Sequence, residues 1–173
     1  MERTLRGTGG ALAALLALAL ACGGVAAASA AQPLSVAVRR LSLDTALQAA
    51  QAALASCRAK GLQVAVTVVD RDGLPQVMLR DVLAPELSLR VSRLKAYTAA
   101  SFDSPTSSLQ ARAASGLAHV PGLLFEAGAV PIHAAGMLYG AIGVSGAPSG
   151  LTDEACARAG ADAVQDPLEM QQP

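Results

Sequence analysis

The chain has 173 residues, a length that favours one domain over two. Its 13 basic and 13 acidic residues balance and are spread along the chain, which argues against nucleic acid as a partner. The hydrophobic fraction of 53% is raised by alanine and by one N-terminal segment, so it does not by itself indicate a membrane protein.

Residues 1–31 have the three parts of a secretory signal peptide. Arg3 and Arg6 precede an apolar run over residues 11–21, and small residues continue to Ala31. The run is about 11 residues long, whereas a membrane-spanning helix needs about 20, so no stable span is expected after cleavage. We expect a mature chain that begins near Ala31 and is periplasmic or secreted.

Cys22 raises the alternative of a bacterial lipoprotein, because a cysteine directly after an apolar run is a lipidation signal. Leu20 lies one position away from where such a signal usually has its leucine. Residues 28–30, Ala-Ser-Ala, form a good cleavage site for an ordinary signal peptide. We therefore expect cleavage after this site rather than lipidation of Cys22.

Hydrophobic spacing and turn residues predict the elements of the mature chain. They are a helix from Ser42 to Cys57, strands over 63–69 and 75–80, a helix from Pro85 to Phe102, a short helix from Pro105 to Ala114, strands over 128–132 and 137–144, and a helix from Thr152. This order predicts an α+β fold: an antiparallel sheet of about five strands flanked by helices, with the N- and C-terminal helices packed together. The predicted parts are an N-terminal extension over 32–40, a domain over 41–165 and a flexible tail over 166–173.

The mature chain keeps two cysteines. Cys57 lies on the buried stripe of the first helix, and Cys156 lies in the first turn of the last helix. Export into an oxidising compartment and helices on the same sheet face would together allow a disulfide between them. The alternative is two buried free thiols, since free cysteine is often buried.

Four segments occur in an order that resembles the GlcG/HbpS family. They are Arg58–Gly61 with Val64–Gly73, Lys95–Phe102, His119–Gly122 and Gly140–Gly146. The likeness covers residues 41 to about 164, and the surroundings of both cysteines look like an exported branch of the family. The resemblance implies a profilin-like domain that forms homo-oligomers, and haem or a related tetrapyrrole as ligand. Ala127 departs from the double glycine that is more usual at this place.

Three side chains are candidate ligands of a haem iron, which is commonly held by histidine and sometimes by tyrosine. His119 is the first choice, because it lies within a segment that resembles the family's; the alternative is an exposed loop histidine. His133 lies between strands and can instead face solvent or a partner subunit. Tyr97 is a candidate oxygen ligand or a packing residue.

Three cations on one predicted helix, Arg90, Arg93 and Lys95, are candidates to bind haem propionates, because guanidinium and ammonium groups bind carboxylates. Each could equally belong to a solvated helix face. Asp70 and Asp72 resemble half of a calcium loop, but no glutamate completes it at the required distance, so they are read as turn formers.

The sequence thus predicts an exported protein that binds haem and sequesters or carries it. The alternative is a non-catalytic oligomeric accessory or sensor protein that binds another small molecule or a partner protein. The scarcity of aromatic residues favours this alternative, because two Phe, two Tyr and no Trp offer little flat apolar surface to a porphyrin. The resemblance also allows haem degradation, but no catalytic residue is identified, so enzymatic activity stays open.

Overall fold

The structure is a computed structural model that describes residues 34–171. It divides the chain into Met1–Val36 and Ala37–Pro173, and the second unit holds all the helices and strands described below. The predicted signal peptide and Cys22 lie outside the described residues. Within the part that is described, no helix is both long and apolar enough to cross a membrane.

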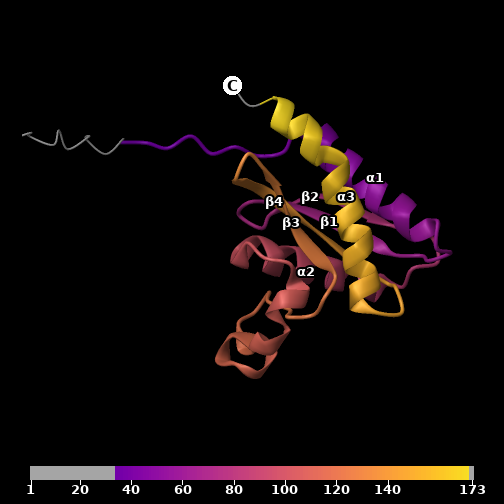
Figure 1. The fold of residues 1–173 in the computed structure, drawn as a ribbon. Coiled ribbons are helices and arrows are strands. Elements are labelled where there is room, and N and C mark those ends of the chain that lie inside the picture. The colour runs from indigo at the N-terminus through magenta and orange to yellow at the C-terminus, as the bar shows by residue number, and fades with distance from the viewer. Residues whose placement is uncertain (1–33, 172–173) are drawn as a thin grey trace, which may run out of the picture. The chain divides into compact units, whose positions relative to one another are not determined.

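One antiparallel sheet forms the centre of the second unit (Figure 1). Its strands are β1 (Ala65–Asp70), β2 (Pro75–Arg80), β3 (Ala129–Ala134) and β4 (Met137–Ser145). They are ordered β2-β1-β4-β3, with every neighbouring pair antiparallel. The predicted α+β class is confirmed, with four strands among the described residues where about five were expected. The two strands predicted over 128–132 and 137–144 form as β3 and β4.

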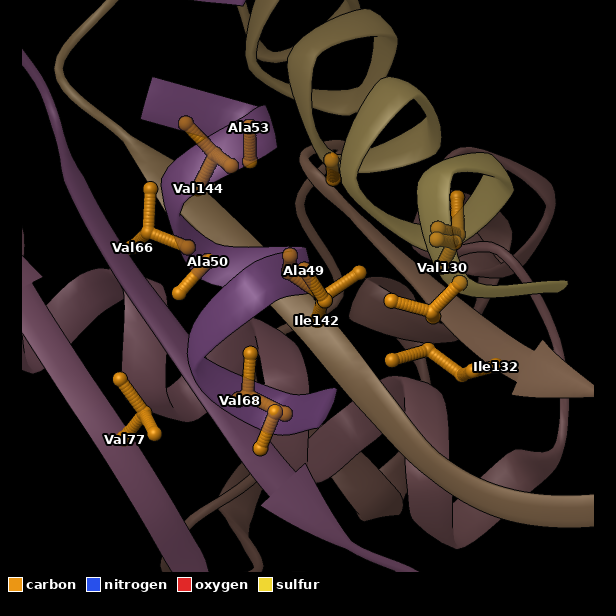
Figure 2. Packing of buried hydrophobic residues seen from close by; sticks show 14 of the residues in the cluster. Ala49, Ala50, Ala53, Val66, Val68, Val77, Val130, Ile132, Ile142 and Val144 are labelled. Carbon is orange, nitrogen blue, oxygen red and sulfur yellow. The ribbon is translucent and has the colours of Figure 1, made fainter. Parts of the chain in front are cut away.

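Two helices cover one face of the sheet. α1 (Leu43–Arg58) and α3 (Gly150–Met170) pack side by side, as predicted for the terminal helices (Figure 1). Small residues allow the close approach: a Cβ at Gly160 would lie 2.6 Å from the carbonyl oxygen of Ala49. The apolar face below them consists of Val66, Val68, Val130, Ile132, Ile142 and Val144. Figure 2 shows Val66 and Val68 beside the alanines of α1, and Val130 next to α3. Burial of this apolar surface holds the layers together.

The predicted Cys57–Cys156 disulfide joins these two helices. Both cysteines are fully buried, and their Cα atoms lie 5.6 Å apart. The bond connects the C-terminal turn of α1 to the first part of α3, across a sequence separation of 99 residues. The alternative of two free thiols does not hold in this structure.

α2 (Glu86–Phe102) covers the opposite face of the sheet (Figure 1). It lies directly on β4, where a Cβ at Gly143 would come within 2.7 Å of the Ala96 backbone nitrogen. The hydroxyl groups of Ser92 and Thr67 are 2.8 Å apart and form a buried hydrogen bond between helix and sheet. The lack of a side chain at Gly143 therefore sets how close α2 sits to the strands.

The chain after α2 forms two 3-10 helices rather than the predicted short α-helix. They are η1 (Thr106–Ala114) and η2 (Gly116–His119). Pro105 precedes η1, as predicted, and the Thr106 hydroxyl holds the segment to β3 by accepting from the Ala129 N–H at 3.0 Å. Most of this segment is exposed, so few buried contacts favour a longer regular helix.

The last helix continues to Met170. Residues 166–170, which were expected to belong to a flexible tail, are therefore helical. Pro167 lies inside α3 and has no N–H to donate to the carbonyl of Ala163. The Gln48 side chain of α1 donates to that carbonyl instead, at 3.4 Å. Leu168 is buried in the core, and this burial favours another turn of helix beyond the proline.

Candidate functional site

A cavity of about 360 Å³ lies along one face of α2. It is lined by Arg90, Arg93, Leu94, Tyr97 and Gly122. The four helical residues follow the i, i+3, i+4, i+7 spacing, which places them on one stripe of the helix. Arg90 and Arg93 are exposed, whereas Leu94 and Tyr97 are half-buried. The result is a largely apolar hollow with two guanidinium groups among its lining residues.

Two glycines lie against the Tyr97 ring, and Gly73 makes room for it. A Cβ at Gly73, in the turn between β1 and β2, would overlap the ring. A Cβ at Gly122 would lie 3.4 Å from its Cε1 atom. Both glycines have positive φ angles, of 81° and 97°, a conformation that other residues adopt at a cost. Tyr97 is thus held between two chain segments and forms a fixed wall of the cavity.

His119 lies outside the cavity lining. It is exposed at the end of η2, three residues before Gly122, which does line the cavity. The structure therefore places the first-choice iron ligand on the segment that leads to the cavity but not within it.

His133 contacts Asp103 and does not line the α2 cavity. It lies on the edge strand β3, and its Nε2 is 2.6 Å from Oδ1 of Asp103, at the C-terminal end of α2. Both side chains line a second hollow of about 340 Å³, together with Arg158 and Asp162 of α3. His133 and the α2 cavity are therefore separate features of the surface.

Lys95 does not line the α2 cavity with Arg90 and Arg93. Its Nζ is buried against the sheet, 2.9 Å from Oδ2 of Asp153 and 3.4 Å from the carbonyl oxygen of Val144. Position 95 is two residues before Tyr97, and such residues point to nearly opposite sides of a helix. Its ammonium group is committed to Asp153, so the cavity that holds Tyr97 has two cations in its lining rather than three.

Burial raises the pKa of the Asp153 carboxyl above its ordinary value. The ammonium group of Lys95 and the N–H of Ala147, which donates to Oδ1 at 2.9 Å, lower this pKa in part but do not offset the loss of water. The pair is thus a buried polar contact between α2 and α3, and sequence reasoning did not find Asp153 because 58 residues separate it from Lys95.

The residues of the α2 cavity fit the chemistry of haem. Leu94 and the Tyr97 ring offer apolar surface, and Arg90 and Arg93 can each form paired hydrogen bonds to a carboxylate. Gly122 also lines the cavity. Sequence reasoning identified the two arginines and the tyrosine, but it missed Leu94 and Gly122. The helical spacing of positions 90, 93, 94 and 97 was the signal that could have found Leu94.

Together, the fold and the cavity define a small α+β domain with one antiparallel sheet and an arginine-edged apolar cavity on its single-helix face. A family model described as "Haem degrading protein HbpS-like" matches residues 41–162. The chain belongs to this HbpS-like family.

Solved structures support this assignment. A double mutant of HbpS from Streptomyces reticuli is 42% identical with a TM-score of 0.72, over 75% of this chain and 90% of that one. ORFY from Klebsiella pneumoniae is 25% identical with a TM-score of 0.70, over 76% and 94%. A PduOC:heme complex is 27% identical with a TM-score of 0.67, over 72% and 94%. No curated protein matches the chain.

Proposed function

We propose that this protein is exported, binds haem in the α2 cavity, and sequesters or carries it. The observation that carries the proposal is the apolar hollow with Arg90 and Arg93 in its lining. Membership of the HbpS-like family supports it, as does the similarity to a protein whose structure contains haem.

Different residues of the chain would bind different parts of haem. Arg90 and Arg93 would pair with the two propionates, while Leu94 and the Tyr97 ring would contact the porphyrin. A volume of about 360 Å³ is near the lower end for ligand cavities, about 300 to 1,000 Å³, so part of the tetrapyrrole stays outside. His119 would be the residue that holds the haem iron, because it is exposed on the segment that leads to Gly122. Bound haem would itself supply the redox chemistry that haem degradation requires.

A haem titration of the mature apo-protein tests the proposal. We expect a shifted Soret band at stoichiometric haem, about tenfold weaker binding for Arg90→Ala and for Arg93→Ala, and an altered spectrum for His119→Ala. Arg158→Ala, on the opposite face of the sheet, is the matched control and should bind like the wild type. An unshifted Soret band in the wild type would remove the proposed function.

The dimethyl ester of haem separates the role of the arginines from that of the apolar wall. This probe keeps the porphyrin plane but cannot accept paired hydrogen bonds as a carboxylate does. The wild type should bind it about tenfold more weakly than haem, and the arginine variants should bind both probes alike. Equal affinity of the wild type for both probes would exclude propionate recognition by Arg90 and Arg93.

Export is the second part of the proposal, and it rests on the signal-peptide pattern of residues 1–31. Expression of the full chain in a bacterium should yield a periplasmic or secreted product whose N-terminus lies near Ala31. A product that retains Met1, or one that carries lipid on Cys22, would contradict this part and leave the haem proposal intact.

A non-catalytic oligomeric accessory or sensor role is the second candidate function. The observation in its favour is that Tyr97 is the only aromatic side chain among the described residues that line the cavity. The haem titration, combined with a measurement of native mass, distinguishes the two: an oligomer that leaves the Soret band unshifted would favour this role.

A further inference from the structure

A third cavity, larger than the two described above, lies beside α2, next to the start of α3. It has a volume of about 480 Å³. Among its lining residues are Ser88, Val91, Lys95, Leu124, Ser149 and Asp153. They come from α2, from the segment before β3 and from the first turn of α3. None of these residues lines the proposed haem cavity, so an occupant of this cavity would be a separate ligand.

A primary amine and a carboxyl group are buried together in the wall of this cavity. Lys95 is 5% exposed and Asp153 is 3% exposed, with 2.9 Å between Nζ and Oδ2. Gly128 leaves the space that the amine occupies, because a Cβ there would lie 2.6 Å from Nζ. Burial also raises the pKa of Asp153, which makes its carboxylate a better proton acceptor than an ordinary aspartate.

The charges around the cavity indicate what it can hold. Its charged lining residues are Lys95, Asp153 and the exposed Glu126, which together carry one net negative charge. Anions are therefore disfavoured, whereas a small neutral molecule can enter among apolar residues such as Val91 and Leu124. Buried lysines beside a proton acceptor are the groups with which proteins form imines with carbonyl compounds.

We propose that this cavity binds small neutral aldehydes or ketones, and that Lys95 captures them as a protonated imine beside Asp153. The lysine ammonium first passes one proton to the carboxylate, and the free amine attacks the carbonyl carbon to form a C–N bond. Asp153 returns its proton to the former carbonyl oxygen and takes a second proton from nitrogen.

Loss of water completes the step. Asp153 protonates the hydroxyl group, the C–O bond breaks, and the nitrogen lone pair forms the C=N bond. The sum is ammonium plus carbonyl compound giving protonated imine plus water, so no oxidant or reductant is needed. The product nitrogen keeps its positive charge next to the carboxylate of Asp153, and the ion pair between α2 and α3 is preserved.

Borohydride trapping tests this inference with propanal as the probe. The chain contains two lysines, and the exposed Lys60 is an internal control in the same sample. After brief incubation at neutral pH and reduction, peptide mass mapping should find the propyl group on Lys95 about tenfold faster than on Lys60. An unmodified Lys95 in folded protein whose Lys60 is labelled would overturn the inference.

Variants separate the imine from ordinary surface chemistry. Lys95→Arg keeps a cation beside Asp153 but has no primary amine, so only Lys60 and the chain terminus should be labelled. Asp153→Asn should slow labelling of Lys95 to the rate of Lys60, whereas Glu126→Gln should leave it unchanged. Labelling of Lys95 only after denaturation would also overturn the inference. Lys95→Arg should bind haem like the wild type, so this result does not depend on the haem titration.

Discussion

Cys57 on α1 and Cys156 on α3 are covalently joined, although they lie 99 positions apart in the sequence. The bond therefore closes a loop that contains the whole sheet and α2. In the chain-entropy model, a loop of about 100 residues contributes about 4 to 5 kcal/mol to stability through the unfolded state.

Replacing both cysteines by alanine should lower the free energy of unfolding by about 4 kcal/mol. Urea unfolding followed by circular dichroism measures this change. The single variant Cys57→Ala is the matched control, because it breaks the bond but keeps one buried sulfur, and it should lose a similar amount. A loss below about 1 kcal/mol in both variants would contradict a stabilising disulfide.

Gly73→Ala should be more harmful than Gly61→Ala. Both glycines have positive φ, of 81° and 72°, so each substitution strains the backbone by about 1 kcal/mol. A Cβ at Gly61 meets no atom within 4 Å, whereas a Cβ at Gly73 overlaps the Tyr97 ring. We expect a further loss of about 1 to 3 kcal/mol for Gly73→Ala, measured by urea unfolding. Equal losses would show that Tyr97 moves away without cost.

The contribution of the buried Lys95–Asp153 pair to the free energy of unfolding should depend on both residues. Lys95→Met leaves an uncompensated carboxylate in the interior and should cost about 3 to 5 kcal/mol. Adding Asp153→Leu removes that charge, and the double variant should recover most of the loss. A double-mutant cycle of unfolding free energies measures the coupling. Additive losses would show that the two groups do not interact.

Asp153 should also impose a pH dependence on stability. Its pKa is raised in the folded state, chiefly by burial, so the folded chain holds this proton above the range where the unfolded carboxyl loses it, about pH 3.9. The contribution of Asp153 to the unfolding free energy therefore falls as pH rises from about 3.9 through the folded-state pKa. Asp153→Asn should remove this decline in urea unfolding across a pH series. Glu126→Gln is the control, and a decline that persists in Asp153→Asn would assign it to another group.

Local patterns were sufficient for much of the fold. The stripe ending at Cys57 predicted α1, the Asp70–Gly73 turn predicted the hairpin, and the order of elements predicted the α+β class. Side-chain chemistry identified Arg90, Arg93 and Tyr97 as site candidates on one predicted helix, and the structure brings them to one cavity. These predictions succeeded because helical and strand periodicity depend on neighbours a few residues apart.

The contacts of individual polar side chains could be identified only from the tertiary structure. Lys95 and Arg93 carry the same charge and lie two positions apart. Lys95 is buried, however, because it forms an ion pair with Asp153 of α3. His133 contacts Asp103 across the gap between β3 and α2, and nothing near either residue predicts that pairing. The end of α3 likewise depends on Gln48 of another helix. Such contacts depend on which surfaces meet when the layers pack, and the spacing of residues along one segment contains no information about them.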